Sequence, residues 1–136
     1  MSDKIEKVDL IGINRLGIRE DPVHHGYALL PFKLSGIPDP RWDEVFKHEY
    51  AIYAHNKKRN LVLQDRTYNE IVLRIGEEDD PQVHYDILKA VIEATNKAVD
   101  TMNIDLAFRE KAQKQQGQKR REKIDRLKEK ADKVKL

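Results

Sequence analysis

The chain has 136 residues, the size of one ordinary domain with room for a short extension. Charged residues make up 37% of it, and no stretch approaches the roughly 20 apolar residues of a membrane-spanning helix, so we expect no membrane contact. The absence of cysteine excludes a disulfide framework, a thiol nucleophile and a zinc site with cysteine ligands. No apolar signal segment follows Met1, so we expect a cytoplasmic protein.

Charge is divided unevenly along the chain. Residues 1–108 contain 14 Lys/Arg and 19 Asp/Glu, a net charge of −5, whereas residues 109–136 contain 12 and 5, a net charge of +7. Such asymmetry speaks to the binding partners of a protein more than to its fold. It predicts a core domain over 1–108 and a basic C-terminal extension over 109–136, which is helical or partly flexible.

The first part of the chain has the pattern of two strands. The apolar run over 5–16 predicts a strand covered on both faces, and 27–34 places apolar residues alternately along one face. Pro31 cannot donate a hydrogen bond to a neighbouring strand, so we expect its strand at a sheet edge or with a bulge. The ten residues between, 17–26, are expected to form a long loop, where functional groups tend to lie.

A helix is predicted from Asp39 to about residue 54. The Asp39 carboxylate can accept from the free N–H groups of the first turn, and Pro40 lacks only a donor that this turn does not need. Apolar and aromatic residues then recur at helical spacing, which is typical of a helix packed on a sheet. These residues are Trp42, Val45, Phe46, Tyr50 and Tyr53.

The same order of elements recurs in the second part. Strands near 60–63 and over 70–76, joined by a hairpin connection around 65–69, precede a second helix that starts near Pro81 and keeps an apolar stripe to Leu106. We therefore predict an α+β fold, a two-layer ββαββα sandwich with a four-stranded, mainly antiparallel sheet. Its two helices lie on one face, and the second extends into the basic C-terminal tail.

The pattern of residues in the C-terminal tail predicts that it docks on a partner. Gly117 interrupts a run of helix formers, so we expect either an exposed helix with a hinge there or a flexible linker. Beyond it, apolar residues follow heptad spacing for less than two heptads, and so short a helix needs a partner to be stable. We predict a non-enzymatic binding or assembly module that docks on a protein partner, or on itself as a homo-oligomer, through its open sheet face and C-terminal helix. The expected partner-binding residues are Ile124, Leu127, Val134 and Tyr68.

Two alternatives stay open. A nucleic-acid-binding accessory protein would use two basic clusters, although the tail also carries five acidic residues and lacks a known reading module. A small enzyme would use the loop around His24 and His25, which together with Glu20 and Asp21 are also candidate metal ligands. Adjacent side chains of an extended segment point opposite ways, however, so the two histidines would not face one ion without a turn. We predict no catalytic residue and no cofactor, because no nucleophile elbow, zincin or phosphate-loop motif occurs. The candidate nucleic-acid-binding residues are Lys57, Lys58, Arg59, Lys119, Arg120 and Arg121.

Overall fold

The computed structural model describes residues 4–62 and 69–135. It divides into two units, which we describe separately: Ile5–Asp100, and a second made up mainly of Thr101–Leu136. All the buried hydrophobic side chains among the described residues belong to Ile5–Asp100. The hydrophobic core of the described residues therefore lies within this first unit.

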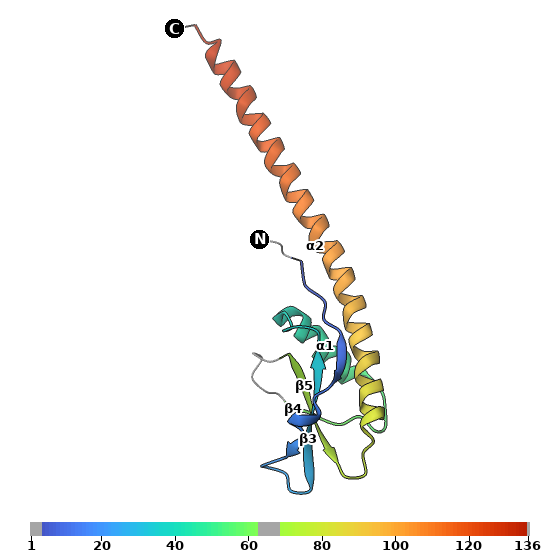
Figure 1. The fold of residues 1–136 in the computed structure, drawn as a ribbon. Coiled ribbons are helices and arrows are strands. Elements are labelled where there is room, and N and C mark those ends of the chain that lie inside the picture. Colours follow the sequence, from blue (N-terminus) through green and yellow to red (C-terminus); the bar gives the residue numbers. More distant parts are fainter. Residues whose placement is uncertain (1–3, 63–68, 136) are drawn as a thin grey trace. The chain divides into compact units, whose positions relative to one another are not determined.

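The fold is α+β, with a mostly antiparallel sheet and two helices (Figure 1), as the sequence predicts. Within residues 4–62 and 69–135, five strands form the sheet rather than four. The elements in chain order are β1 (Leu10–Ile13), the 3-10 helix η1 (Arg15–Gly17), β2 (Arg19–Glu20), β3 (Tyr27–Leu34), α1 (Pro40–Ile52), β4 (Leu61–Val62), β5 (Glu70–Gly76) and α2 (Pro81–Asp132).

The extra strand, β2, follows the first strand and lies in the segment predicted to be a loop. The order in the sheet is β1-β3-β5-β4, and β2 pairs with the same strand, β3, as β1 does. Between them the chain turns through η1, where the Asn14 side chain accepts from the Gly17 N–H at 3.2 Å. The predicted strand over 5–16 is therefore shorter, and the predicted loop over 17–26 contains β2.

The position of Pro31 corrects the expectation of an edge strand or a bulge. β3 is central, with β1 and β2 on one side and β5 on the other, and its register with β5 runs without a shift through the pair Pro31–Val72. The Pro31 carbonyl accepts from the Asn14 N–H at 3.0 Å. In an antiparallel ladder the N–H and C=O of one residue point to the same side. The missing donor of Pro31 therefore faces the break between β1 and β2, where no regular ladder bond is lost.

Most of the core lies on one side of the sheet. Leu30, Phe32 and Leu34 alternate along β3 and are fully buried, and the Phe32 ring lies 6.4 Å from that of Tyr85 on α2. Both helices contribute their apolar sides, and α1 begins as predicted, with the Asp39 carboxylate accepting from the Arg41 N–H at 2.9 Å. The buried residues of the helices are Trp42, Phe46 and Tyr50 on α1, and His84, Ile87, Leu88, Val91, Ile92, Thr95 and Val99 on α2.

A polar contact joins three segments inside this core. The fully buried Trp42 stacks on Phe46, and its Nε1 donates to the Asn96 side-chain oxygen at 2.8 Å. The Asn96 amide nitrogen donates in turn to the Val8 carbonyl at 2.9 Å and to an Asp9 carboxylate oxygen at 3.2 Å. Asn96 therefore ties α1 and the segment before β1 to α2.

Helix α2 continues without interruption through Gly117 to Asp132. Of the two forms expected for the tail, the structure has the helical one, and it has no hinge at the glycine. A Cβ built at Gly117 meets no atom within 4 Å, so packing within the chain does not require a glycine there.

Candidate functional site

The expected partner-binding residues lie on the C-terminal part of α2 and just past its end. Ile124 and Leu127 are one turn apart in the helix, with side chains 53% and 64% exposed. Val134 follows the helix, where its N–H donates to the Ala131 carbonyl at 3.1 Å, and its side chain is also exposed. Tyr68 lies outside the described residues. The structure thus brings Ile124 and Leu127 onto one helical surface.

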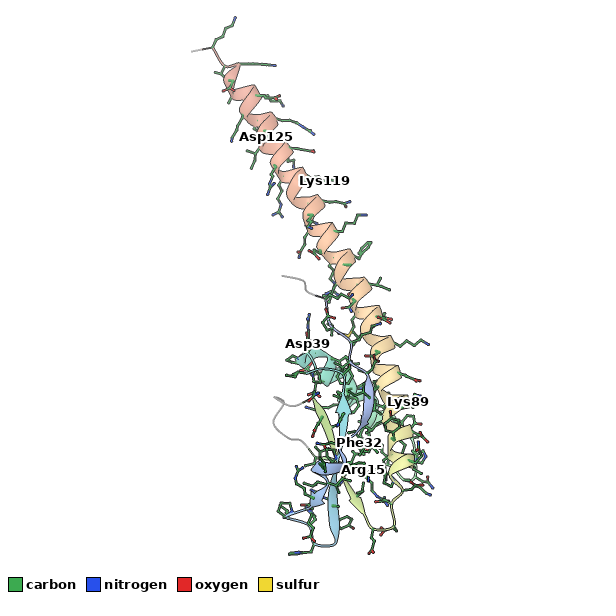
Figure 2. The ribbon with its side chains drawn as sticks, viewed as in Figure 1. Arg15, Phe32, Asp39, Lys89, Lys119 and Asp125 are labelled. Atoms are coloured by element: carbon green, nitrogen blue, oxygen red, sulfur yellow. The ribbon has the colours of Figure 1, made fainter. Side chains whose placement is uncertain are left out.

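Ion pairs between residues one turn apart accompany this exposed helix, whose side chains Figure 2 shows with Lys119 and Asp125 labelled. Such pairs stabilise an exposed helix only slightly, so they explain in part why it persists with no buried side chain after Val99 among the described residues. The pairs are Asp105 with Arg109 at 3.1 Å, Glu110 with Lys114 at 3.9 Å and Glu122 with Arg126 at 3.9 Å.

A second pair of exposed apolar residues on α2 was missed from the sequence. Ile104 and Phe108 are each 73% exposed and lie four residues apart, hence on the same side of the helix. Their spacing was visible in the sequence. They lie off the apolar stripe that the sequence predicts up to Leu106, so no role was predicted for them, and the structure shows that they are uncovered.

In the basic cluster Lys57, Lys58 and Arg59, the charged groups of Lys58 and Arg59 contact other parts of the chain. The Lys58 ammonium donates to the Tyr50, Ala51 and Tyr53 carbonyls at 2.9, 3.2 and 3.0 Å, which closes the C-terminal end of α1. The Arg59 guanidinium pairs with a carboxylate, described below. Lys57 is exposed, and its backbone N–H donates to a ring nitrogen of His55.

The Arg59 pair forms a polar cluster where β5 ends and α2 begins. The Asp79 side chain, 5% exposed, accepts from Arg59 Nη2 at 2.8 Å and from the Gly76 N–H at 2.7 Å. The hydrogen bonds from Arg59 hold the pKa of Asp79 below its usual value. His84 Nε2 lies 3.8 Å from Asp79, and burial lowers the His84 pKa although the neighbouring carboxylate opposes this. Asp79 therefore anchors Arg59 and the β5–α2 turn instead of capping α2.

A second buried carboxylate holds the loop before β3. Asp21 accepts from the Arg74 guanidinium and from the Val23 and His24 N–H groups, the last two at 2.9 and 3.2 Å. These hydrogen bonds, chiefly that of Arg74, lower the Asp21 pKa from 3.8 to about 2. The loop that the sequence marked as a candidate enzyme site is thus fixed by an ionised carboxylate.

His24 and His25 line different surface hollows. His24 lies beside Arg59 and Arg74 in one of about 380 Å³, whereas His25 lies in another of about 550 Å³ with Asp21. The structure does not bring the two imidazoles to one site. Within 4–62 and 69–135, no three His, Asp or Glu side chains are grouped so that they could hold a metal ion.

The exposed part of α2 is accordingly the candidate functional site. None of the helices in the described part of the chain is long and apolar enough to cross a membrane. Comparisons of the chain with protein-family models, with curated proteins and with solved structures found no match in any of the three.

Proposed function

We propose that this protein is a non-enzymatic binding or assembly module that docks on a partner through the C-terminal part of α2. The observation that carries the proposal is a formed helix with large apolar side chains, Ile124 and Leu127, more than half exposed on one side. Exposed apolar residues at helical spacing are the anchors by which an amphipathic helix binds a groove or another helix. Full burial of such a side chain contributes about 1.5–3 kcal/mol, so burying the exposed half of these two side chains stabilises a complex by about 2 kcal/mol.

The sheet face opposite the helices, which the sequence also predicted as a docking surface, offers fewer exposed apolar side chains for docking. Leu29 and Val72 lie on this face, because they alternate with Leu30 and Leu73 along β3 and β5, and both are already buried within the chain. Arg74, paired opposite Leu29, lies on the same face and is held by Asp21. The proposal therefore assigns docking chiefly to α2.

Site-specific photo-cross-linking in the organism of origin tests this proposal. A photoreactive amino acid at position 127 should capture a partner, identified by mass spectrometry as another protein or as a second copy of the chain. The same amino acid in place of Asp125, on the opposite side of the helix, is the matched control and should capture far less. Equal capture at the two positions, or none at either, would contradict docking through this side of α2.

Nucleic-acid binding is the second candidate function. It is favoured by the net charge of +7 over residues 109–136 and by the exposure of Lys119, Arg120 and Arg121. Lys58 and Arg59, in contrast, are held by chain carbonyls and by Asp79. Binding of a DNA or RNA duplex that weakens steeply with added salt, and that is lost on replacing the three tail residues by Gln, would support it. The cytoplasmic location stays a prediction.

A further inference from the structure

Small and apolar residues lie along one side of the C-terminal part of α2. Positions seven residues apart return to the same side of a helix that packs on another helix. On this basis Gly117, Ile124 and Ala131 form one row, and Arg120 and Leu127 form a second row beside it. We call the small and apolar residues of these rows, Gly117, Ile124, Leu127 and Ala131, the seam. Large side chains occupy its middle and small ones its ends.

A hollow lies at the N-terminal end of the seam. It measures about 480 Å³ and is lined by Glu110, Gln113, Lys114, Gly117, Gln118 and Arg121. A Cβ at Gly117 would meet no atom within 4 Å. A large side chain of a partner helix can enter this space, as a knob enters a hole in helix packing. The seam is therefore longer than its two large apolar residues indicate.

From Arg121 to Lys130, the residues that border the seam are all basic. In a helix pair, the positions just before and just after the apolar line face the partner and decide which partner is accepted. Here no acidic residue takes such a position, and in the described part of the chain these side chains make no ion pair. The bordering residues, which we call the flanks, are Arg121, Lys123, Lys128 and Lys130.

The acidic residues of the same segment all lie away from the seam. Between Gly117 and Asp132 they are Glu122, Asp125, Glu129 and Asp132, each on the outer side of the helix. Glu122 there pairs with Arg126 at 3.9 Å. Charge is thus mixed on the outer side and positive beside the seam, a separation that the total charge of the segment does not reveal.

This arrangement disfavours a second copy of the chain as the partner. In a parallel pair, Lys123 of one copy would face Lys128 of the other, and in an antiparallel pair each flank would face the same flank of its neighbour. Both orientations bring like charges together, which is destabilising. Resting on the proposed docking function, we propose that the seam binds an amphipathic helix of another protein whose own flanking positions are acidic.

A variant of the full chain with acidic flanks can serve as the partner helix in a test of this inference. A flank variant, Lys123→Glu, Lys128→Glu and Lys130→Glu, keeps the seam and has acidic flanks. An outer-face variant, Lys119→Glu, Arg126→Glu and Lys133→Glu, has the same change of net charge, with the first two residues on the opposite side of the helix and the third just past its end. Circular dichroism checks that both variants retain the helix. Each variant is then mixed with the unmodified chain, and association is measured by sedimentation equilibrium.

The unmodified chain should associate with the flank variant at least about tenfold more tightly than with itself or with the outer-face variant. Added salt should weaken the mixed complex, and Ile124→Asp with Leu127→Asp should abolish it. Self-association of the unmodified chain as tight as the mixed complex would overturn the choice of an acidic partner, whereas docking itself would stand.

Two other outcomes are decisive. If the mixture does not associate and the photoreactive residue at position 127 captures nothing, the docking function fails together with the inference. If the unmodified chain binds a DNA duplex, and the flank variant loses that binding while Ile124→Asp with Leu127→Asp keeps it, the flanks serve phosphate groups and the acidic helix is refuted.

Discussion

Replacing Asn96 with alanine tests whether one side chain joins α1 and the N-terminal segment to α2. The Trp42 indole is 0% exposed, and its Nε1–H has the Asn96 oxygen as its acceptor at 2.8 Å. Without this oxygen, a buried donor is left unpaired, which costs about 1–3 kcal/mol. The lost hydrogen bond to the Val8 carbonyl adds less than about 1 kcal/mol, and the higher helix propensity of alanine offsets about 0.5 kcal/mol. We expect Asn96→Ala to lower the free energy of unfolding by about 2 kcal/mol.

Urea unfolding measures this difference. Trp42 is the only tryptophan of the chain, so its fluorescence reports on the core, and circular dichroism at a helical wavelength reports on α1 and α2. Lys89→Ala is the matched control, because Lys89 is an exposed residue of the same helix, and it should change the free energy of unfolding by less than about 0.5 kcal/mol.

A double-mutant cycle isolates the hydrogen bond. Trp42→Phe removes the indole N–H but keeps an aromatic ring against Phe46. In that background, followed by circular dichroism, Asn96→Ala should cost about 1 kcal/mol less than in the unmodified chain. An equal cost in the two backgrounds, or a cost below about 0.5 kcal/mol in the unmodified chain, would refute the reasoning.

Three further predictions follow from contacts of the same kind. Gly117→Ala should stabilise the surrounding helix by about 1 kcal/mol, seen as slower amide hydrogen exchange, because the new Cβ meets nothing; unchanged exchange would contradict this. Lys58→Met should lower the free energy of unfolding by about 1 kcal/mol through loss of its three carbonyl contacts, whereas Lys57→Met should not. The lowered pKa of Asp79 means that its ionised form stabilises the fold above the usual carboxylate pKa, and that this stabilisation is lost as the pH falls through the lowered value. Asp79→Asn should therefore destabilise the protein most near neutral pH, and urea unfolding at several pH values should show the difference shrinking in acid; a difference independent of pH would show that Asp79 acts without its charge.

Elements with strong local signals were predictable from the sequence. The start of α1 is one example, since Asp39 and Pro40 act through the first turn alone and need no distant residue. The apolar stripes of both helices and the alternation along β3 are others, because burial of one side imposes its period on the sequence. Together these patterns were enough for the α+β class.

Contacts between distant residues were not predictable in this way. Four carboxylates, at positions 77–80, precede α2 and favour the start of that helix. Which of them pairs with Arg59, twenty residues before Asp79, depends on where β4 and β5 place the two segments. Lys58 was assigned to a basic cluster, and its contact with three α1 carbonyls arises only when the following chain folds back on that helix. Neither contact leaves a pattern along the sequence.

The sequence by itself determined the class of fold, both helix starts and the uneven charge, because each depends on the composition or period of neighbouring residues. Only the tertiary structure decided that β3 with its proline is central, since this requires a break in the strand beside it. It also decided that α2 passes through Gly117 as a helix. A glycine destabilises a helix too little to stop it, so the sequence left both a helix and a flexible linker open. Because the helix is continuous, its basic flanks lie on either side of one apolar line.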